Sequence, residues 1–158
     1  MQAQSQSEGG NKMQIQLTTD YAIRILTYLA MKKAVASSTE LSIKLEIPQK
    51  YVARVGYKLK NANLADTVTG SLGGYILTRP VEDISLYDII EALEDGVKIN
   101  RCLEDERLCS RNATSFCVVH DFFHELQSTI DEKLKSETLA TLLQRKKHVN
   151  NSRGKLVI

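Results

Sequence analysis

The chain has 158 residues, of which 42% are hydrophobic and 25% are charged, and this describes one globular domain, alone or with an appended helix. No apolar run approaches the roughly 18 residues that span a membrane, and the polar N-terminus has no hydrophobic signal core, so we expect a cytoplasmic protein. The net charge of +2 is uneven: residues 1–64 carry nine Lys/Arg against four Asp/Glu, and residues 65–135 carry seven against fourteen. A basic front half suits a module that binds a polyanion, although ordinary scatter of surface charge would give the same excess.

The first apolar periodicity begins after a polar leader. Residues 1–12 lack any periodic apolar pattern, so we expect a disordered leader with Met13 as the natural start. Apolar residues then recur at helical spacing, which predicts a first helix over about 18–33, capped by Thr18 or Thr19.

Two further helices are predicted in quick succession. Ser37 and Glu40 have the spacing of a capping box, which predicts a second helix that runs to about Glu46. Pro48 after Ile47 starts a third helix, since proline suits the first helical position and disfavours helical geometry in the residue before it.

The third helix has two different faces. Its apolar face consists of Val52, Val55, Leu59 and Ala62, and its polar face consists of Lys50, Arg54, Tyr57, Lys58 and Asn61. A cationic, hydrogen-bonding face on the second helix of a helix-turn-helix is typical of a recognition helix in the DNA major groove. A solvated surface face is the alternative if this helix is considered by itself.

Two short strands are predicted next, over 64–68 and 75–78, joined by a loop with the sequence TGSLGG. Three glycines in this loop permit backbone conformations with positive φ. The sequence therefore predicts a winged helix-turn-helix domain over 13–80. A phosphate-cradling loop is disfavoured, because the glycines fit no nucleotide-binding spacing and no helix follows directly.

Candidate DNA contacts lie on the third helix and in the wing. The predicted DNA-binding residues are Lys50, Tyr51, Arg54, Tyr57, Lys58, Thr69 and Ser71. Arg54, near the start of the recognition helix, is the candidate for a bidentate guanine contact, whereas Lys58 and Lys60 are expected to bind phosphates.

A fourth helix and a cysteine-containing loop follow the wing. Ser85 is expected to cap the helix, Asp88 suits its positive end, and the helix should end near Asp95-Gly96. The loop over 97–116 is polar and has no apolar face. A loop of this length in a compact domain usually needs a functional reason or an internal ligand to stay ordered. The three cysteines of the chain lie in it or directly after it: Cys102, Cys109 and Cys117.

A long helix with an apolar stripe comes next. The stripe consists of Phe116, Val119, Phe123, Leu126 and Ile130, and Phe122 and Leu134 widen it. Its alternating steps of three and four residues are close to those of a coiled-coil seam, and the rest of the chain offers little for it to pack on, so we expect a two-fold dimer interface. Residues 81–143 would thus form a cysteine-loop and dimerisation region. Ser136 is predicted to cap a last short helix through Leu143, and residues 144–158 should form a flexible basic tail.

Several segments together resemble one family of regulators. They are QIQLTTDYAIR (14–24), GSLGGYIL (70–77), ISLYDIIEALE (84–94), the three spaced cysteines and TLATL (138–142). Over about residues 13–143 the chain resembles the winged-helix regulators that include the iron–sulfur regulator IscR and the nitric-oxide sensor NsrR. The resemblance implies a mainly α fold with a small β-hairpin, and a homodimeric transcription factor that binds double-stranded DNA. It also implies an iron–sulfur cluster, held by the three cysteines and one further ligand, whose loss, oxidation or nitrosylation changes DNA binding.

Two residues are candidates for the fourth ligand. The resemblance places His120 at the position of the histidine in IscR-like proteins with a 2Fe–2S cluster. It places Asp20 at the position of the aspartate that NsrR-like proteins supply from the partner chain to a 4Fe–4S cluster. The cysteines are separated by six and seven residues, whereas five in each gap is common among the relatives, so both cluster types stay open.

Other uses of the cysteines are possible on chemical grounds. Zinc is one alternative, because Cys102, Cys109, Cys117, His120 and His124 contain enough ligands for a tetrahedral site. A metal-free thiol switch is another. We expect no enzyme, because neither a nucleophile elbow nor an H-E-x-x-H motif accompanies the cysteines. A non-catalytic protein-interaction module is the remaining alternative.

Overall fold

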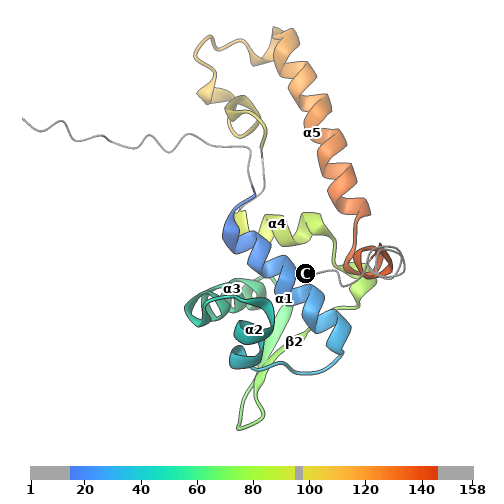
Figure 1. Cartoon of the computed structure of the whole chain (residues 1–158). Helices are drawn as coiled ribbons and strands as arrows, with labels where there is room; N and C mark the ends of the chain where they lie inside the picture. Colours follow the sequence, from blue (N-terminus) through green and yellow to red (C-terminus); the bar gives the residue numbers. More distant parts are fainter. Residues whose placement is uncertain (1–14, 95–97, 146–158) are drawn as a thin grey trace, which may run out of the picture.

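The computed structural model describes residues 15–94 and 98–145, and Figure 1 shows a helical body from which one long helix projects. The body contains α1 (Leu17–Lys32), α2 (Ser38–Leu45), α3 (Gln49–Asn61), the strands β1 (Ala65–Val68) and β2 (Gly74–Leu77), a 3-10 turn (Val81–Asp83) and α4 (Leu86–Glu94). The projecting helix is α5 (Val118–Ser136), and residues 139–145 form a further helical segment. The predicted leader, the end of the fourth helix at Asp95-Gly96 and residues 146–158 of the predicted tail lie outside the described residues.

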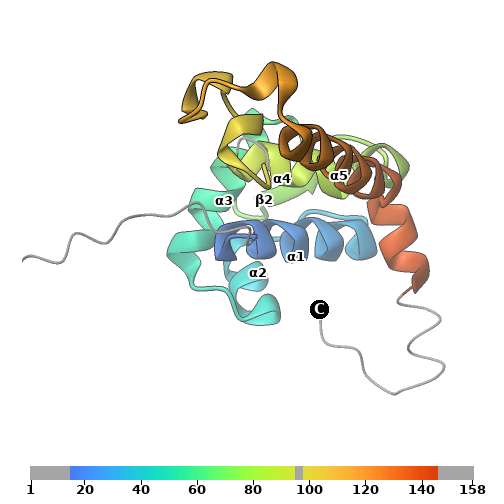
Figure 2. The same ribbon diagram turned by 90° about the horizontal axis from the view of Figure 1, so that it is seen from above.

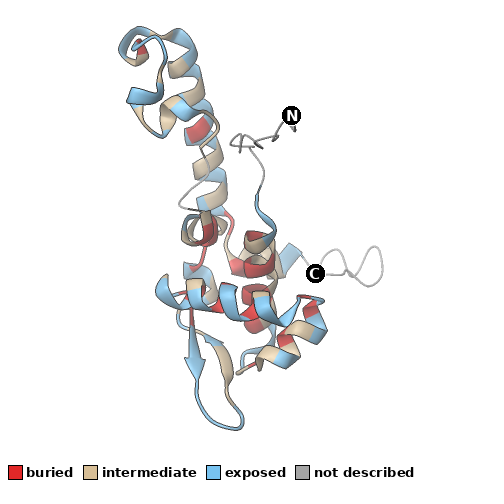
Figure 3. Ribbon diagram, turned by 90° about the vertical axis from the view of Figure 1, so that its left-hand side faces the viewer, coloured by how far each residue is buried: buried red, intermediate tan, exposed pale blue. Residues whose placement is uncertain are grey.

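This arrangement confirms the predicted mainly α winged-helix fold. Helices α1, α2 and α3 enclose the core, in which Ile25, Leu41, Val52 and Leu59 are almost completely buried. The apolar face predicted for the third helix is the face that packs inward: Val52, Val55 and Leu59 are buried and Ala62 is partly buried. Figure 3 shows buried residues concentrated in the body. None of the helices in the described ranges is long and apolar enough to cross a membrane.

The wing is an antiparallel hairpin attached to the body on one side. Ala65 pairs with Leu77 and Val68 with Gly74. On the outer edge of β2, Ala36 and Tyr75 exchange two backbone hydrogen bonds of 3.0 and 2.8 Å. A Cβ atom at Gly74 would lie 2.2 Å from the carbonyl oxygen of Ala36, so this close approach requires glycine.

The hydrogen-bond partners at the N-terminal ends of α1 and α2 differ in part from those predicted. Neither Thr18 nor Thr19 caps α1: the N-cap residue is Gln16 and it makes no side-chain cap hydrogen bond. Instead Glu94, at the end of α4, accepts hydrogen bonds from Gln16 N and Thr19 Oγ1. Ser37 does cap α2, by accepting from the N–H of Glu40.

The start of α4 has the predicted cap. Ser85 Oγ accepts from the N–H of Asp88, and the Asp88 carboxylate accepts from both the N–H and the hydroxyl of Ser85. The same end of α4 pairs with the residues that follow α5, since Leu86 N donates to Glu137 O and Leu139 N donates to Ile84 O. In a perpendicular view α5 lies over α4 (Figure 2).

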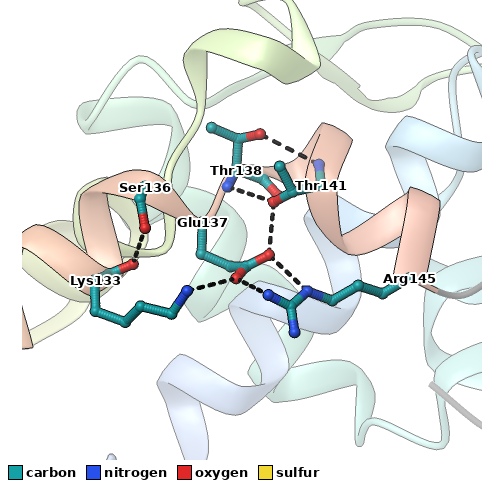
Figure 4. A network of polar contacts seen from close by, with 6 residues as sticks. All are labelled: Lys133, Ser136, Glu137, Thr138, Thr141 and Arg145. Atoms are coloured by element: carbon teal, nitrogen blue, oxygen red, sulfur yellow. Dashed lines mark hydrogen bonds and ion pairs between the residues drawn. The ribbon is translucent and has the colours of Figure 1, made fainter.

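The prediction that Ser136 caps the last helix is wrong. Ser136 is the last residue of α5, and its hydroxyl donates to Lys133 O. Thr138 is the residue that caps the following helix, because its Oγ1 accepts from Thr141 N at 3.3 Å. Figure 4 shows Glu137 between the two helices: its carboxylate accepts hydrogen bonds from Thr141 and Arg145 and forms an ion pair with Lys133. Gln144 and Arg145, predicted as the start of the tail, belong to the helical segment.

Candidate DNA interface and metal site

Of the predicted DNA contacts on α3, three are exposed, whereas Tyr51 and Lys58 are partly buried. Lys50, Arg54 and Tyr57 are exposed, and the Tyr57 side chain keeps 68% of its surface accessible. Tyr51 instead turns toward α1, where its ring lies 5.7 Å from that of Tyr21 between centroids. These positions make Arg54 and Tyr57 available to a partner, whereas Tyr51 also fixes α3 against α1.

The ammonium groups of Lys58 and Lys60 are bound within the chain. Lys58 Nζ donates to the carbonyl oxygen of Leu93 at 2.7 Å, although we expected it to face a phosphate. Lys60 Nζ lies 2.7 Å from the Asp66 carboxylate and donates to Thr67 Oγ1, both on β1. The two lysines therefore connect α3 to α4 and to the wing.

A glycine in the middle of α3 fixes the wing against the recognition helix. A Cβ atom at Gly56 would lie 2.3 Å from Cε1 of Tyr75, so the ring of this β2 residue rests directly on the helix backbone. Glycine in a helix interior costs about 1 kcal/mol relative to alanine, and here the packing of Tyr75 explains it. Tyr75 was not among the predicted site residues, although a glycine inside a strongly periodic helix is a usable signal of close packing.

The wing loop presents small polar groups and one apolar side chain. Thr69 and Ser71 are exposed, and Leu72 beside them is 90% exposed. Gly70 has a φ of 109°, which confirms the expectation that this loop uses positive φ. Because residues 69–73 carry no charged side chain, any DNA contact of this loop relies on hydrogen bonds and apolar contact.

The three cysteines lie in a segment beside the first half of α5, away from the body (Figure 1). The segment contains three 3-10 turns: Arg101–Leu103, Glu106–Leu108 and Thr114–Phe116. Cys102 lies in the first turn, Cys109 follows the second, and Cys117 is the N-cap residue of α5. All three are free thiols and partly buried.

Only part of the predicted ligand set is assembled. His120 Nδ1 lies 3.3 Å from Cys102 Sγ, so α5 presents its imidazole to the first 3-10 turn. Among residues 15–94 and 98–145, no three His, Cys, Asp or Glu side chains are grouped closely enough to hold a metal ion. His124, the fifth candidate for zinc, lines a separate cleft with Gln127 and Asp131.

Asp20 lies apart from the cysteines in a single chain. It is in the first turn of α1, within the body, and its carboxylate forms an ion pair of 2.6 Å with Arg24. About half of its side chain is exposed. Within one chain the local arrangement therefore favours His120 as the neighbour of the cysteines.

Cys109 has a distinct electrostatic environment. The backbone N–H groups of Ala113 and then of Arg111 point at its sulfur and lower the pKa of the thiol, and the charge of Arg111 acts in the same direction. A lowered pKa raises the thiolate fraction, and the thiolate is the form that binds metals and reacts with oxidants.

Gln127 anchors the cysteine segment to α5. It is the only buried side chain of that helix, and its Oε1 accepts a hydrogen bond of 3.0 Å from Ile99 N. Its Nε2 donates to Asp131. Gln127 was not among the predicted site residues, because a single glutamine directly after Leu126 has the pattern of an ordinary surface residue.

Three residues of the apolar stripe of α5 are exposed in the single chain, whereas Phe123, Ile130 and Leu134 are half-buried. Exposed fractions are 54% for Val119, 60% for Phe122 and 40% for Leu126. An exposed apolar surface of this kind is typical of a protein–protein interface.

Comparisons with known proteins cover residues 15–145 of the chain. The sequence model of the Rrf2 family, described as an iron-dependent transcriptional regulator, matches residues 15–145. A protein of Aquifex aeolicus named as an HTH-type transcriptional regulator is 32% identical over 127 residues, which cover 80% of this chain and 88% of that protein. The HTH-type transcriptional regulator NsrR of Halalkalibacterium halodurans is 28% identical, over 83% of this chain and 90% of that one.

Solved structures show the same fold. CymR (YrzC), the global cysteine regulator of B. subtilis, superimposes with a TM-score of 0.69 at 25% identity, over 84% of this chain and 97% of CymR. The IscR of T. potens superimposes with a TM-score of 0.67 at 24% identity, over 90% of this chain and 93% of that one.

Proposed function

Because the chain belongs to the Rrf2 family of DNA-binding transcriptional regulators, we propose that it is a homodimer whose affinity for a palindromic operator is controlled by an iron–sulfur cluster. The DNA interface would consist of the exposed face of α3, with Arg54 and Tyr57, and of Thr69 and Ser71 in the wing loop. A helix face in the major groove would supply sequence selectivity, and the wing would add contacts to the backbone or the minor groove.

The observation that supports the cluster most directly is the pairing of Cys102 with His120 at 3.3 Å. Three thiols and one imidazole form a donor set suited to an iron–sulfur cluster, which supplies a centre that reacts with oxidants, nitric oxide or changes in iron supply. The donor chemistry therefore fits, with Cys102, Cys109, Cys117 and His120 as the proposed ligands. The 3-10 turn that contains Cys102 and the one that precedes Cys109 are three residues each and contain no buried residue, so the segment could rearrange around a cluster without disturbing the core.

Asp20 remains the alternative fourth ligand, and its position suggests that it would bind the cluster of a second copy of the chain. Its carboxylate is about half exposed on the body, so it could reach only a cysteine segment that another copy of the chain brings close. This alternative therefore requires the dimer, whereas ligation by His120 does not.

The proposed dimer is supported by α5. Its exposed Val119, Phe122 and Leu126 form a seam that a second α5 could cover. A two-fold axis along this helix would place two recognition helices on two half-sites of a palindrome.

Anaerobic purification tests the cluster. We expect a coloured protein with iron and acid-labile sulfide in near-equal amounts. His120→Ala should lower cluster occupancy or change the absorption spectrum, whereas the matched His124→Ala should not. Loss of the wild-type spectrum in Asp20→Asn with retention in His120→Ala would instead assign Asp20 as the ligand. A colourless protein with stoichiometric zinc would contradict the proposal.

A metal-free thiol switch is a second candidate, and the environment of Cys109 favours it. Attack of the Cys109 thiolate on hydrogen peroxide would transfer one oxygen to sulfur, giving a sulfenic acid and releasing hydroxide. In cluster-free protein, peroxide should then change operator affinity in the wild type and not in Cys109→Ser, with Cys117→Ser as the control. A response lost equally in both variants would argue against a special role of Cys109.

A further inference from the structure

We propose that Lys58 is a positioning residue that couples the recognition helix to the end of α4, so that the state of the cysteine segment alters DNA affinity through it. This inference rests on the proposed function, because it assumes that the cysteine segment controls DNA binding. It assigns Lys58 a role different from a phosphate contact.

The hydrogen bond of Lys58 joins α3, which carries the proposed DNA contacts, to α4, which precedes the cysteine segment in the sequence. Lys58 lies on α3, one helical turn after Arg54, and its Nζ donates to Leu93 O at 2.7 Å. Leu93 is buried and is the last residue but one of α4. In the sequence, Cys102 follows nine residues after Leu93.

The C-terminal end of α4 is a favourable place for a cation. The last four carbonyl groups of a helix lack intrahelical partners and form the negative end of its dipole. A lysine that donates to one of them satisfies the carbonyl and meets a favourable potential. The contact is partly buried, so solvent screens it less than it would screen an exposed pair.

The end of α4 is also held from a second side. Glu94 accepts hydrogen bonds from Gln16 N and Thr19 Oγ1 at the start of α1. Helix α4 therefore ends at a junction with α1 and α3, and its other end is paired with the residues after α5.

These connections suggest a route from the cysteines to the DNA. The cysteine segment is bound to α5 through Gln127, and its N-terminal side continues from α4. A rearrangement of the segment that displaces the end of α4 would pull on Lys58 or release it. In either case the polar face of α3, together with the wing that is packed on it, would change its position relative to α4 and to the DNA.

The test compares Lys58→Met with Lys50→Met. Methionine keeps much of the apolar stem of Lys58 and removes the donor, whereas Lys50 is an exposed cation of the same helix. Operator affinity is measured by fluorescence anisotropy for the cluster-loaded and cluster-free forms of each protein, at several salt concentrations. For the wild type we expect affinities that differ at least about fivefold between the two forms, as is usual for coupled sites.

In Lys58→Met we expect this ratio to fall toward one, with the salt dependence of binding unchanged. Lys50→Met should keep the ratio. Lys58→Arg, which retains a cation and a donor, should keep most of the wild-type ratio. If Lys58→Met fails to fold by circular dichroism, Lys58→Ala, which also removes the donor, replaces it.

Two results would overturn this inference alone. If Lys58→Met weakens both forms equally and lowers the salt slope by about 0.9, Lys58 is a phosphate contact. If Lys58→Met keeps the wild-type ratio and salt slope, the contact with Leu93 carries no coupling. A wild type with equal affinities in both forms would remove the proposed cluster control together with this inference, and the wild-type measurement alone identifies that case.

Discussion

Replacement of Glu137 by glutamine should destabilise the junction between α5 and the body. The Glu137 side chain is only 10% exposed, and its carboxylate accepts from Thr141 Oγ1 at 2.7 Å and from Arg145 Nη2 at 2.6 Å. Hydrogen bonds to a charged group contribute about 1.5–3 kcal/mol each, but Arg145 is largely exposed and contributes less. We therefore expect a loss of about 2 kcal/mol, or about 4–8 °C in Tm for a chain of this size.

The effect should depend on pH in a defined direction. The hydrogen bond from Thr141, followed by the charge of Arg145, lowers the pKa of Glu137 on folding. A carboxyl group with a lowered pKa stabilises the folded state above its unfolded pKa of about 4.3, and this contribution disappears as the pH falls through the folded pKa. The Tm difference between wild type and Glu137→Gln should thus be largest near pH 7 and shrink in acid.

Thermal unfolding followed by circular dichroism measures both effects, at one fixed protein concentration because a dimer's Tm depends on concentration. Glu132→Gln, on the exposed surface of α5, is the matched control and should change stability by less than about 0.5 kcal/mol. A Tm of Glu137→Gln within 1 °C of the wild type at neutral pH would refute the reasoning, as would an equal deficit at neutral and acidic pH.

Three further predictions concern the DNA interface and the dimer. Arg54→Ala should weaken operator binding by about 1–3 kcal/mol and random-DNA binding much less, as measured by anisotropy; equal losses would remove Arg54 from base recognition. Gly56→Ala places a methyl group against Tyr75 and should cost about 1–3 kcal/mol in chemical denaturation. In a Tyr75→Ala background the same change should be neutral or stabilising, and a persistent cost there would point to another cause. Phe122→Glu should give a monomer in analytical ultracentrifugation, and a dimer that persists at low micromolar concentration would argue against the α5 seam.

The sequence was sufficient to predict the helices and the hairpin, because each has a regular pattern, and in α1, α2 and α3 the apolar positions are also the buried ones. Helix caps were less predictable where the partner is remote. Thr18 and Thr19 were plausible caps from local sequence, yet the group that satisfies the start of α1 is Glu94, which lies 75 residues beyond Thr19. Local rules worked for Ser85 and Asp88, whose hydrogen bonds stay within one turn.

The candidate site was predictable to a similar extent. Exposure of Arg54 and Tyr57 follows from helical periodicity, since the opposite face is apolar. The partners of Lys58 and Lys60 do not follow from helical periodicity. A long flexible lysine side chain can reach either a phosphate or a neighbouring element of the chain, and the sequence pattern is the same in both cases. The contact between Cys102 and His120 likewise depends on the course of the whole segment between them, which has no periodic pattern.

The pairing of Ala36 with Tyr75 has a consequence for self-association. A hairpin has two outer edges, and an exposed edge with free N–H and C=O groups can recruit strands from other molecules. Ala36 occupies the outer edge of β2, so β1 carries the open edge of the wing. There the Asp66 carboxylate accepts from Thr67 N at 2.6 Å and pairs with Lys60. A charged strand with one donor already bound is a poor template for β-aggregation, so the wing can stay thin and exposed for DNA without making concentrated protein prone to form intermolecular sheets.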